Sequence, residues 1–289
     1  MGSAIQLNRL GYDKIAILDR EDDLGGTWHV NRYPGLTVDV PSTTYSYRFE
    51  PNPYWSRLYA PGSELKTYAE HVADKYDLRR YMRFNTVVDG ARWDDDAQEW
   101  LVSLSDGQTL HTRFLILATG YLCQPKKPDI PGIESFTGTV LHAQEWDHSY
   151  SLAGKRAAII GTGSTGVQLI PKLAEDASEL TVYQRTPIWV MPKLDFGFGP
   201  RAQRLFAKVP ATQRMLRVSS DLFMDIMVTL AMWRFRQFRP VNRIAAAIGR
   251  LHRFAAIRDR DLRRKLTPSY DFGCKRPTLS NVYYRTFNK

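Results

Sequence analysis

The sequence predicts an α/β fold with two Rossmann-like dinucleotide-binding units, and three observations support this prediction. An apolar run at 156–160 leads into Gly-Thr-Gly-Ser-Thr-Gly at 161–166, where a buried strand would meet a helix. A second apolar run, at 14–19, ends in Asp19, as the second strand of such a unit does. Between the two, residues 84–120 alternate short strands and turns, which is typical of an antiparallel meander.

In the first unit, Ile5 to Leu10 have the pattern of a helix end that closes at Gly11, before a strand at 14–19. The acid of a dinucleotide unit lies about 20 residues beyond the third loop glycine and accepts hydrogen bonds from a ribose hydroxyl. Counting back from Asp19 puts that glycine at or before Met1. We therefore expect a fragment without the first strand and its glycine loop. The alternative is an ordinary helix followed by a strand.

Two glycines stand beside an aromatic residue in the stretch Asp23-Leu-Gly-Gly-Thr-Trp28. Paired glycines let a backbone approach a flat ligand closely, and an aromatic side chain can cover a ring. The alternative is a plain Gly-Gly turn with a core tryptophan. The residues Tyr33-Pro-Gly35, Asp39 and Tyr45 follow within the same region.

The meander is expected to contain strands at 83–88, 91–93, 100–104 and 112–118, with a turn at 105–107. It would return to the sheet of the first unit at Ala118-Thr-Gly120. That short signal is common by chance, and its weight comes from its place between the two nucleotide units.

The second unit meets the context that its motif demands, with a strand at 156–160, a helix at 167–174 and a strand at 180–183. Nineteen residues past Gly166, where an acid would accept from a free 2′-hydroxyl, stand Arg185 and Thr186. A guanidinium suits a 2′-phosphate, so the sequence favours NADP over NAD. A solvated arginine at a strand end is the alternative.

The composition describes a globular chain of 289 residues with 43% apolar residues and a net charge of +10. Two cysteines, Cys123 and Cys274, are too few for a disulfide framework, and the N-terminus lacks the layout of a signal peptide. No run reaches the 18 or so apolar residues of a spanning helix. The histidines lack the spacing of metal ligands. We expect a cytoplasmic protein without a metal site.

The basic excess lies in the last third, where residues 201–289 contain 20 Lys+Arg against 5 Asp+Glu. Residues recur at helical spacing within 201–265, which predicts helices there: Leu216, Ser219, Phe223, Ile226 or Met227, Leu230 and Trp233. A solvated face on inserted helices is the favoured interpretation. Peripheral contact with anionic lipid is the second. Nucleic-acid binding is not expected, because no recognised module accompanies the charge.

The stretch from Phe136 to Asp147, just before the second glycine loop, carries a longer fingerprint. It has the pattern Phe-x-Gly-x-x-x-His-x-x-x-Trp-Asp, with fixed positions at Phe136, Gly138, His142, Trp146 and Asp147. Fingerprint and loop together resemble the Baeyer–Villiger branch of the class B flavin-dependent monooxygenases. The resemblance covers essentially the whole chain, and members of the family continue beyond the point that matches Lys289.

The resemblance implies two cofactors and three regions. FAD would occupy a domain at 1–150, NADPH a domain at 151–200 and 266–289, and a basic helical insertion would span 201–265. The residues implied for FAD are Asp19, Gly25, Gly26, Thr27, Trp28, Asp39, Tyr45 and Val88. Those implied for NADPH are Gly161, Gly163, Ser164, Thr165, Gly166, Arg185, Thr186 and Lys275.

Gly273-Cys-Lys-Arg-Pro277 resembles the segment that carries the active-site arginine of this family. By that resemblance Arg276 is catalytic, and Asp39 is the counter-charge that orients it. NADPH would reduce FAD, O₂ would form a flavin peroxide, and the guanidinium would favour the anion that attacks a ketone or oxidises a sulfur or nitrogen centre. His142 and Trp146 would couple domain movement to cofactor binding, not transfer protons. The alternative is a non-catalytic chain that binds NADP(H) and a membrane surface.

Overall fold

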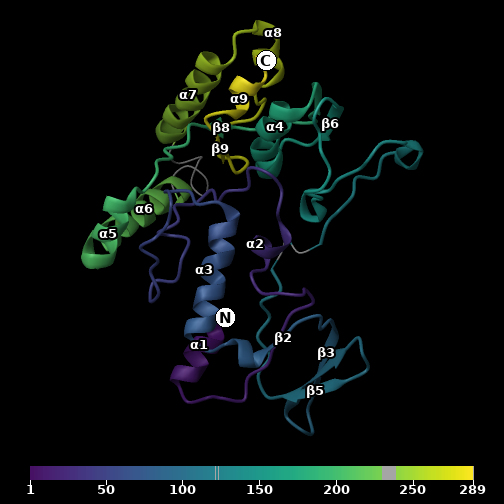
Figure 1. The fold of residues 1–289 in the computed structure, drawn as a ribbon, viewed down its shortest axis with the longest axis vertical. Helices are drawn as coiled ribbons and strands as arrows, with labels where there is room; N and C mark the ends of the chain where they lie inside the picture. Colours follow the sequence, from purple (N-terminus) through teal and green to yellow (C-terminus); the bar gives the residue numbers. More distant parts are fainter. Residues whose placement is uncertain (121, 123, 230–238, 289) are drawn as a thin grey trace. The chain divides into compact units, whose positions relative to one another are not determined.

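The structure, a computed structural model, describes residues 1–120, 122, 124–229 and 239–288. These residues divide into two compact units, one made of Met1–Arg32 with Ser63–Glu145 and the other of Tyr33–Gly62 with Trp146–Lys289. Parallel strand pairs alternate with helices along the chain, and one antiparallel sheet interrupts them (Figure 1). The predicted α/β class is confirmed.

Two helices supply most of the core of the first unit. The first is α1 (Gly2–Arg9), and the second is the longer α3 (Gly62–Lys75). Ile5 of α1 and Val72 of α3 are fully buried, and the hydroxyl of Tyr81 donates to Asn8 Oδ1 at 2.9 Å. The predicted helix end is confirmed, because α1 ends at Arg9 and Gly11 takes a φ of +86°.

The parallel pair of the first unit is shorter than predicted. Strand β1 (Ile17–Leu18) pairs with β2 (Met82–Arg83), where the sequence predicted strand from residue 14 to residue 19. Within the described residues only Ile17 and Leu18 of this segment have strand partners. The short elements α2 (Thr27–Val30) and the 3₁₀ turn η1 (Arg79–Tyr81) complete this part of the unit.

The predicted meander is an antiparallel sheet of three strands, β3 (Val88–Asp94), β4 (Glu99–Leu104) and β5 (Thr109–Thr112). The turn at 105–107 is confirmed, with Gly107 at φ +86°. The strand predicted at 83–88 is wrong, because β2 ends at Arg83 and Asn85 turns the chain with φ +51°. The strand predicted at 112–118 is also wrong beyond Thr112, because that segment has no strand partner in the described part of the chain.

In the second unit, β6 (Arg156–Ile160) and β7 (Glu179–Tyr183) form a parallel pair joined by α4 (Ser164–Asp176). The predicted helix and both predicted strands are confirmed. Alternate residues of each strand, such as Ile159 and Val182, pack against the buried core that includes Ile170 of α4. This strand–helix–strand unit places the second glycine loop at the carboxyl end of β6.

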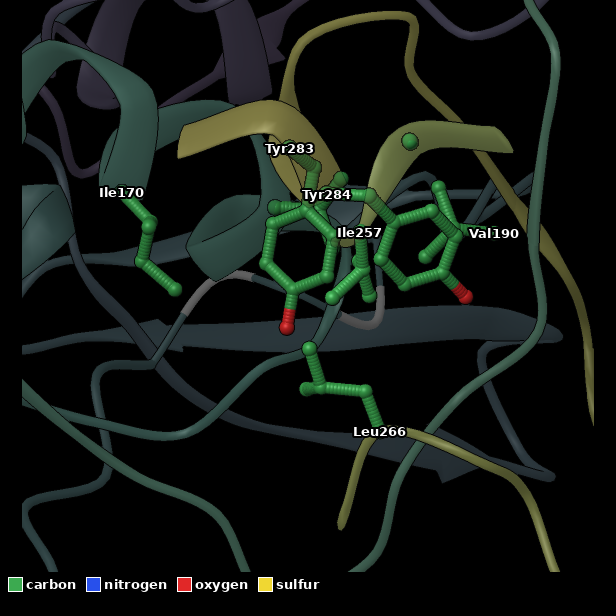
Figure 2. Packing of buried hydrophobic residues seen from close by; sticks show 8 residues of the cluster. Ile170, Val190, Ile257, Leu266, Tyr283 and Tyr284 are labelled. Carbon is green, nitrogen blue, oxygen red and sulfur yellow. The ribbon is translucent and has the colours of Figure 1, made fainter. Parts of the chain in front are cut away.

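A second parallel pair joins two segments that lie far apart in the sequence. Strand β8 (Val190–Met191) pairs with β9 (Thr278–Leu279), and the short helix α9 (Tyr283–Thr286) follows. Tyr283 and Tyr284 of α9 pack among Ile170, Val190, Ile257 and Leu266 (Figure 2). The last described segment is therefore part of the core of the second nucleotide unit.

The basic third is helical, as predicted. It contains α5 (Pro200–Lys208), α6 (Pro210–Val228), α7 (Arg239–Ala256) and α8 (Arg260–Lys265). Phe223 and Ile226 of the predicted helical face are exposed. Leu230 and Trp233 lie outside the described residues. No helix within the described ranges is long and apolar enough to cross a membrane.

Candidate functional site

The second glycine loop is packed tightly at its third glycine. Gly161 has φ +104°, which favours glycine, and its amide donates to the carbonyl of Tyr183 at 3.0 Å. A Cβ added to Gly166 would stand 2.5 Å from the carbonyl oxygen of Gly161. Only a glycine at position 166 lets α4 approach its own loop this closely.

The same loop is open where a ligand would approach. A Cβ added to Gly161 or Gly163 would meet no atom within 4 Å. Gly163 is the N-cap of α4, no side chain caps the helix, and its first turn contains no acid. The first amides of the helix, at Ser164 and Thr165, are therefore the kind of donors that hold a pyrophosphate.

Arg185 and Thr186 stand two and three residues beyond β7, at the same edge of the strand pair as the loop, and the Arg185 side chain is exposed. The neighbouring residue Gln184 is held by Thr162 Oγ1, which donates to its Oε1 at 3.3 Å. The Lys275 ammonium lies 4.9 Å from the centroid of the Tyr270 ring. The part of Arg185 and Lys275 in binding a 2′-phosphate stays a prediction.

The structure brings Asp39 and Arg276 together across 237 residues of sequence. Arg276 Nη2 donates to Asp39 Oδ2 at 2.7 Å, and both residues belong to the second compact unit. Arg276 stands two residues before β9, whose pairing with β8 fixes the segment. The Arg276 side chain is 58% exposed and that of Asp39 30%. The guanidinium is thus oriented by a carboxylate yet still has donors to offer.

In the first unit, Asp19 follows β1 and its Oδ1 accepts from the amide of Glu21 at 3.1 Å. Gly25 and Gly26 have φ of +118° and +52°, and Gly26 caps the short helix that carries Thr27 and Trp28. Both glycines occupy conformations that side chains disfavour. The paired-glycine turn expected from the sequence is present.

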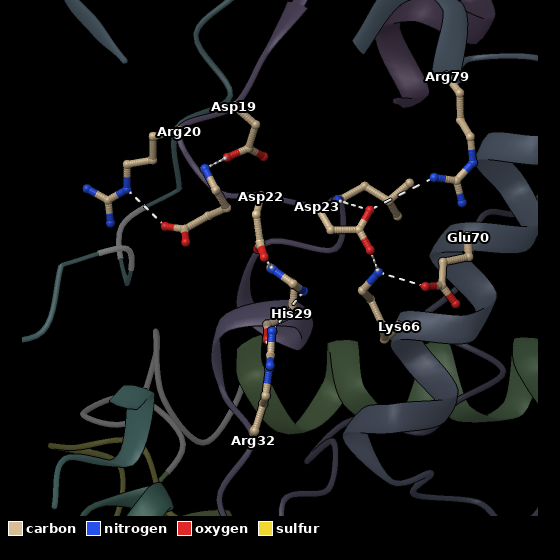
Figure 3. Close-up of polar contacts among 11 residues, drawn as sticks. Asp19, Arg20, Asp22, Asp23, His29, Arg32, Lys66, Glu70 and Arg79 are labelled. Atoms are coloured by element: carbon tan, nitrogen blue, oxygen red, sulfur yellow. Dashed lines mark hydrogen bonds and ion pairs between the residues drawn. The ribbon is translucent and has the colours of Figure 1, made fainter. Parts of the chain in front are cut away.

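An ion-pair network fixes the loop between Asp19 and the paired glycines (Figure 3). Lys66 of α3 contacts Asp23 at 2.5 Å and Glu70 at 2.7 Å. The buried ring of His29 contacts Asp22 through Nε2 at 2.6 Å, and this contact is the main cause that lowers the Asp22 pKa. The loop is therefore tied both to α3 and to α2.

The remaining predicted flavin contacts are divided between the compact units. Val88 begins β3 in the first unit and is exposed. Tyr45 lies in the second unit with Asp39, and it is exposed too. The contacts of Val88 and Tyr45 with FAD stay predictions.

The fingerprint contains the boundary between Glu145 and Trp146 at which the compact units divide. His142 Nδ1 accepts from the amide of Gln144 at 3.3 Å, next to the 3₁₀ turn η3 (Ala143–Glu145). Asp147 accepts from Ser149, and these hydrogen bonds lower its pKa. Phe136 follows the 3₁₀ turn η2 (Ile133–Ser135) and is exposed. His142 and Asp147 of the fingerprint therefore accept hydrogen bonds within local turns.

Sequence reasoning missed Gln168 and Lys193, two residues that contact the segment before Asp39. Gln168 stands two residues after the last loop glycine, and that position is the one signal that could have drawn notice to it. Lys193 belongs to no motif. Within the described part of the chain no group of His, Cys, Asp and Glu is arranged to hold a metal ion.

Comparisons with known proteins agree with this geometry. The family described as "Flavin-binding monooxygenase-like" matches residues 15–217. A Baeyer–Villiger monooxygenase of Streptomyces coelicolor is 39% identical over 289 residues, which are 100% of this chain and 55% of that protein. One from Pseudomonas aeruginosa is 36% identical over 284 residues, 98% of this chain and 53% of that protein.

Solved structures are similar over nearly the whole chain. An oxidised steroid monooxygenase bound to NADP has a TM-score of 0.85 at 30% identity, with 99% of this chain and 61% of that chain covered. A complex of OTEMO with FAD and NADP has a TM-score of 0.82 at 30% identity and the same coverage. The chain thus spans about half the length of the curated relatives above.

The fold and the glycine loop at 161–166 are those of a dinucleotide-binding protein, and the chain belongs to the flavin-binding monooxygenase-like family. Relatives named Baeyer–Villiger monooxygenase match the chain over nearly its whole length. The resemblance seen in the fingerprint is confirmed.

Proposed function

We propose that the chain binds FAD and NADPH and belongs to an enzyme that transfers one oxygen atom of O₂ to a ketone. The observation that carries the proposal is the 2.7 Å contact between Arg276 and Asp39. Both residues were singled out by resemblance, and tertiary structure alone brings them within hydrogen-bond distance. Relatives named Baeyer–Villiger monooxygenase support the same reaction class.

The residues present fit both cofactors. The uncapped N-terminus of α4 and the open space over Gly161 and Gly163 suit the pyrophosphate of a nicotinamide dinucleotide. The exposed Arg185 suits its 2′-phosphate. At Gly26 an added Cβ would meet no atom within 4 Å, which allows close approach to a ring, whereas Gly25 packs against Lys66 and His29. Asp19 retains a carboxylate oxygen for a ribose. The OTEMO structure to which the chain is similar is a complex with FAD and NADP.

When bound, reduced flavin supplies the electrons that activate O₂. The chain supplies the charge that accompanies the transfer. The Arg276 guanidinium is permanently positive and presents several donors, of which Asp39 occupies one direction. Its remaining donors can stabilise negative charge that develops on oxygen when a carbonyl carbon is attacked. Asp39 accepts from one guanidinium nitrogen and so holds the group in place, and the other N–H groups can donate to the developing oxyanion.

The first test is the amount of FAD that co-purifies with the 289-residue chain, measured by visible absorbance against protein concentration. About one flavin per chain supports the proposal. NADPH binding without flavin would instead support the non-catalytic alternative, a chain that binds NADP(H) through 156–186.

The second test compares Arg276→Ala and Arg276→Lys in flavin-loaded protein. We expect both to retain hydride transfer from NADPH within a few fold and to lose ester formation from a ketone by about a thousandfold, the upper effect of removing one oxyanion donor. Retained ester formation in Arg276→Ala would remove Arg276 from the mechanism. Thioether and amine substrates, assayed in parallel, separate ketone oxygenation from oxidation at sulfur or nitrogen.

We also propose a peripheral contact with anionic lipid, because α7 buries its small residues and exposes its large apolar residues. Small residues of α7 face the core: Ala245 and Ala246 are buried, and a Cβ on Gly249 would stand 3.0 Å from Trp189. The large apolar residues Ile244, Ile248, Leu251 and Phe254 are exposed on the opposite side. The helix has no acid, and exposed arginines at 239, 243 and 250 border the apolar stripe.

An apolar stripe edged by arginines is complementary to an anionic bilayer surface. Pairing with a second copy would set like charges against each other. We expect the chain to sediment with vesicles of phosphatidylcholine and phosphatidylserine, less so at high salt, and not with phosphatidylcholine alone. Ile248→Asp with Leu251→Asp should abolish sedimentation without lowering the thermal midpoint. Absence of vesicle binding by the unchanged chain would refute this contact and leave the stripe to a polypeptide partner.

A further inference from the structure

Thr37, two residues before Asp39, is held from two sides by side chains of distant elements. Gln168 Nε2 donates to the Thr37 carbonyl at 2.9 Å, and the Thr37 amide donates to Gln168 Oε1 at 3.3 Å. Lys193 Nζ donates to Thr37 Oγ1 at 3.0 Å. All of these residues belong to the second compact unit.

One edge of the segment forms a backbone bridge between Thr37 and Pro61, and on the other edge the Gln168 amide satisfies both backbone groups of Thr37. The Tyr33 hydroxyl also donates to Gln168 Oε1, at 3.0 Å, which fixes the amide orientation. Gly35, with φ +84°, lies so close to α4 that a Cβ would stand 2.8 Å from the Gln168 carbonyl oxygen. The segment that leads to Asp39 is thus fastened to the first turns of the helix that begins at the second glycine loop.

Lys193 is fastened from the other direction. Its amide donates to Asn281 Oδ1 at 2.8 Å, and Asn281 Nδ2 returns a bond to the Lys193 carbonyl at 2.7 Å. The ammonium lies 4.7 Å from the centroid of Tyr59 and 3.8 Å from Asp195, with only 12% of the side chain exposed. Burial is the main cause that lowers the Lys193 pKa, and the Asp39 charge opposes that shift.

The contacts of Lys193 and Asn281 flank the β8–β9 pair, which also fixes Arg276. Lys193 stands two residues beyond β8, and Arg276 two residues before β9. The same strand pair therefore carries one contact to Thr37 and one to Asp39. The backbone between them is also held, since the Val38 amide donates to the Ala60 carbonyl at 3.0 Å.

We propose that Gln168 and Lys193 are positioning residues that clamp Thr37 and thereby hold Asp39 in register with Arg276. Gln168 fixes the position of the Asp39–Arg276 pair relative to the dinucleotide-binding helix. Lys193 fixes its position relative to the β8–β9 strand pair. The catalytic meaning of the clamp rests on the proposed function. Its physical existence in the chain does not.

The test removes each clamp contact with a change of similar volume. Gln168→Leu deletes both hydrogen bonds to Thr37, and Lys193→Met deletes the ammonium. Glu175→Gln is the matched control, because Glu175 is an exposed residue of α4 whose charge pairs with Lys172. Asp39→Asn is the reference for loss of the pair itself.

The first readout needs no cofactor. Hydrogen exchange of the Val38 amide should be at least tenfold faster in Gln168→Leu and in Lys193→Met than in the unchanged chain or in Glu175→Gln. The guanidinium NMR signals of Arg276 should lose the shift that Asp39 confers, and they should lose it in the same way in Asp39→Asn. Lys193→Arg, which keeps the charge and a donor, should restore most of both signals. Exchange and guanidinium signals like those of the unchanged chain in both variants would overturn the clamp.

The second readout adds NADP⁺. In the unchanged chain, NADP⁺ should slow exchange of the Val38 amide by at least tenfold, whereas in Gln168→Leu the effect should fall below twofold with NADP⁺ affinity within about threefold. An undiminished response in Gln168→Leu would refute the link to the dinucleotide helix. If the unchanged chain fails to bind NADP⁺, the proposed function fails, and the cofactor-free comparison still decides whether the clamp exists.

Discussion

The three glycines of the second loop have different structural roles, although the motif requires glycine at all three positions. Gly161 supplies a positive φ, Gly163 leaves open space above the helix N-terminus, and Gly166 permits contact between α4 and the loop. The sequence pattern predicted all three positions. The assignment of tasks depended on the distance that each missing Cβ would have to its neighbours.

Alanine at positions 163 and 166 should therefore weaken nucleotide binding for different reasons. Gly166→Ala places a Cβ 2.5 Å from a backbone oxygen, so we expect it to lower the free energy of unfolding by about 1–3 kcal/mol. Gly163→Ala meets no protein atom and should leave the free energy of unfolding nearly unchanged while it obstructs the pyrophosphate. Urea unfolding and NADP⁺ titration of both variants check this. Equal destabilisation by the two changes would contradict it.

His252 gives a pH dependence whose sign follows from burial. Its Nε2 contacts the Ser280 carbonyl at 2.9 Å, and desolvation is the main cause that lowers the His252 pKa. Because the unfolded chain takes up this proton first, stability should decline as pH falls below about 6.5, the ordinary value, and level off below the folded pKa.

The measurement is the urea midpoint between pH 8 and pH 5. His252→Gln keeps a donor for the Ser280 carbonyl and removes the titration, so its midpoint should fall less with acidification than that of the unchanged chain. Parallel curves for the two proteins would show that His252 does not contribute.

At the scale of elements, the strand–helix–strand unit at 156–183 could be predicted almost residue by residue. An apolar run leads into a glycine loop and a helix follows it, so the local pattern predicts each element, but only alternate residues of the two strands face the core, where the sequence predicted a buried strand. The segment after Thr112 shows the opposite case. Apolar residues such as Phe114 and Leu117 match a strand pattern, but a strand exists only where a neighbour accepts its hydrogen bonds, and both side chains are exposed.

The short helix α9 contributes two residues to the core, and the sequence did not predict this. Tyr283 is buried among residues of α4, β8 and the segment after α7 (Figure 2). Its hydroxyl has no hydrogen-bond partner within the described residues, and burial raises the Tyr283 pKa. A buried polar group without a partner destabilises a fold by about 1–3 kcal/mol.

Tyr283→Phe should consequently raise the free energy of unfolding, by about 1 kcal/mol. Tyr283→Ala should lower it by about 3–5 kcal/mol, the usual result of emptying an aromatic site. Denaturant unfolding of the two variants provides the comparison. A loss of stability in Tyr283→Phe would show that the hydroxyl has a partner after all.

At the scale of the whole molecule, the two nucleotide sites can be examined separately through their ligands. A ligand that binds only the folded chain stabilises it by about 2.7 kcal/mol at a hundred times its dissociation constant. We expect NADP⁺ to raise the thermal midpoint at concentrations where NAD⁺ does not, because Arg185 can pair with a 2′-phosphate.

Arg185→Ala should lower NADP⁺ affinity by roughly tenfold to a hundredfold, as the loss of a charged hydrogen bond of about 1.5–3 kcal/mol implies. NAD⁺ affinity should not change, since NAD⁺ lacks the phosphate. Calorimetric titration of both dinucleotides provides the check. A parallel loss for NADP⁺ and NAD⁺ would assign Arg185 a structural role.

By itself the sequence determined the family, the glycine loop at 161–166, the order of the nucleotide units and the helical nature of the basic third. These are properties of short segments, whose periodicity and turn residues act locally. Only the tertiary structure decided that Asp39 meets Arg276, and that Gln168 and Lys193 meet at Thr37. Those contacts join segments more than a hundred residues apart, and their geometry follows from strand pairing and close helix packing, which no local pattern encodes.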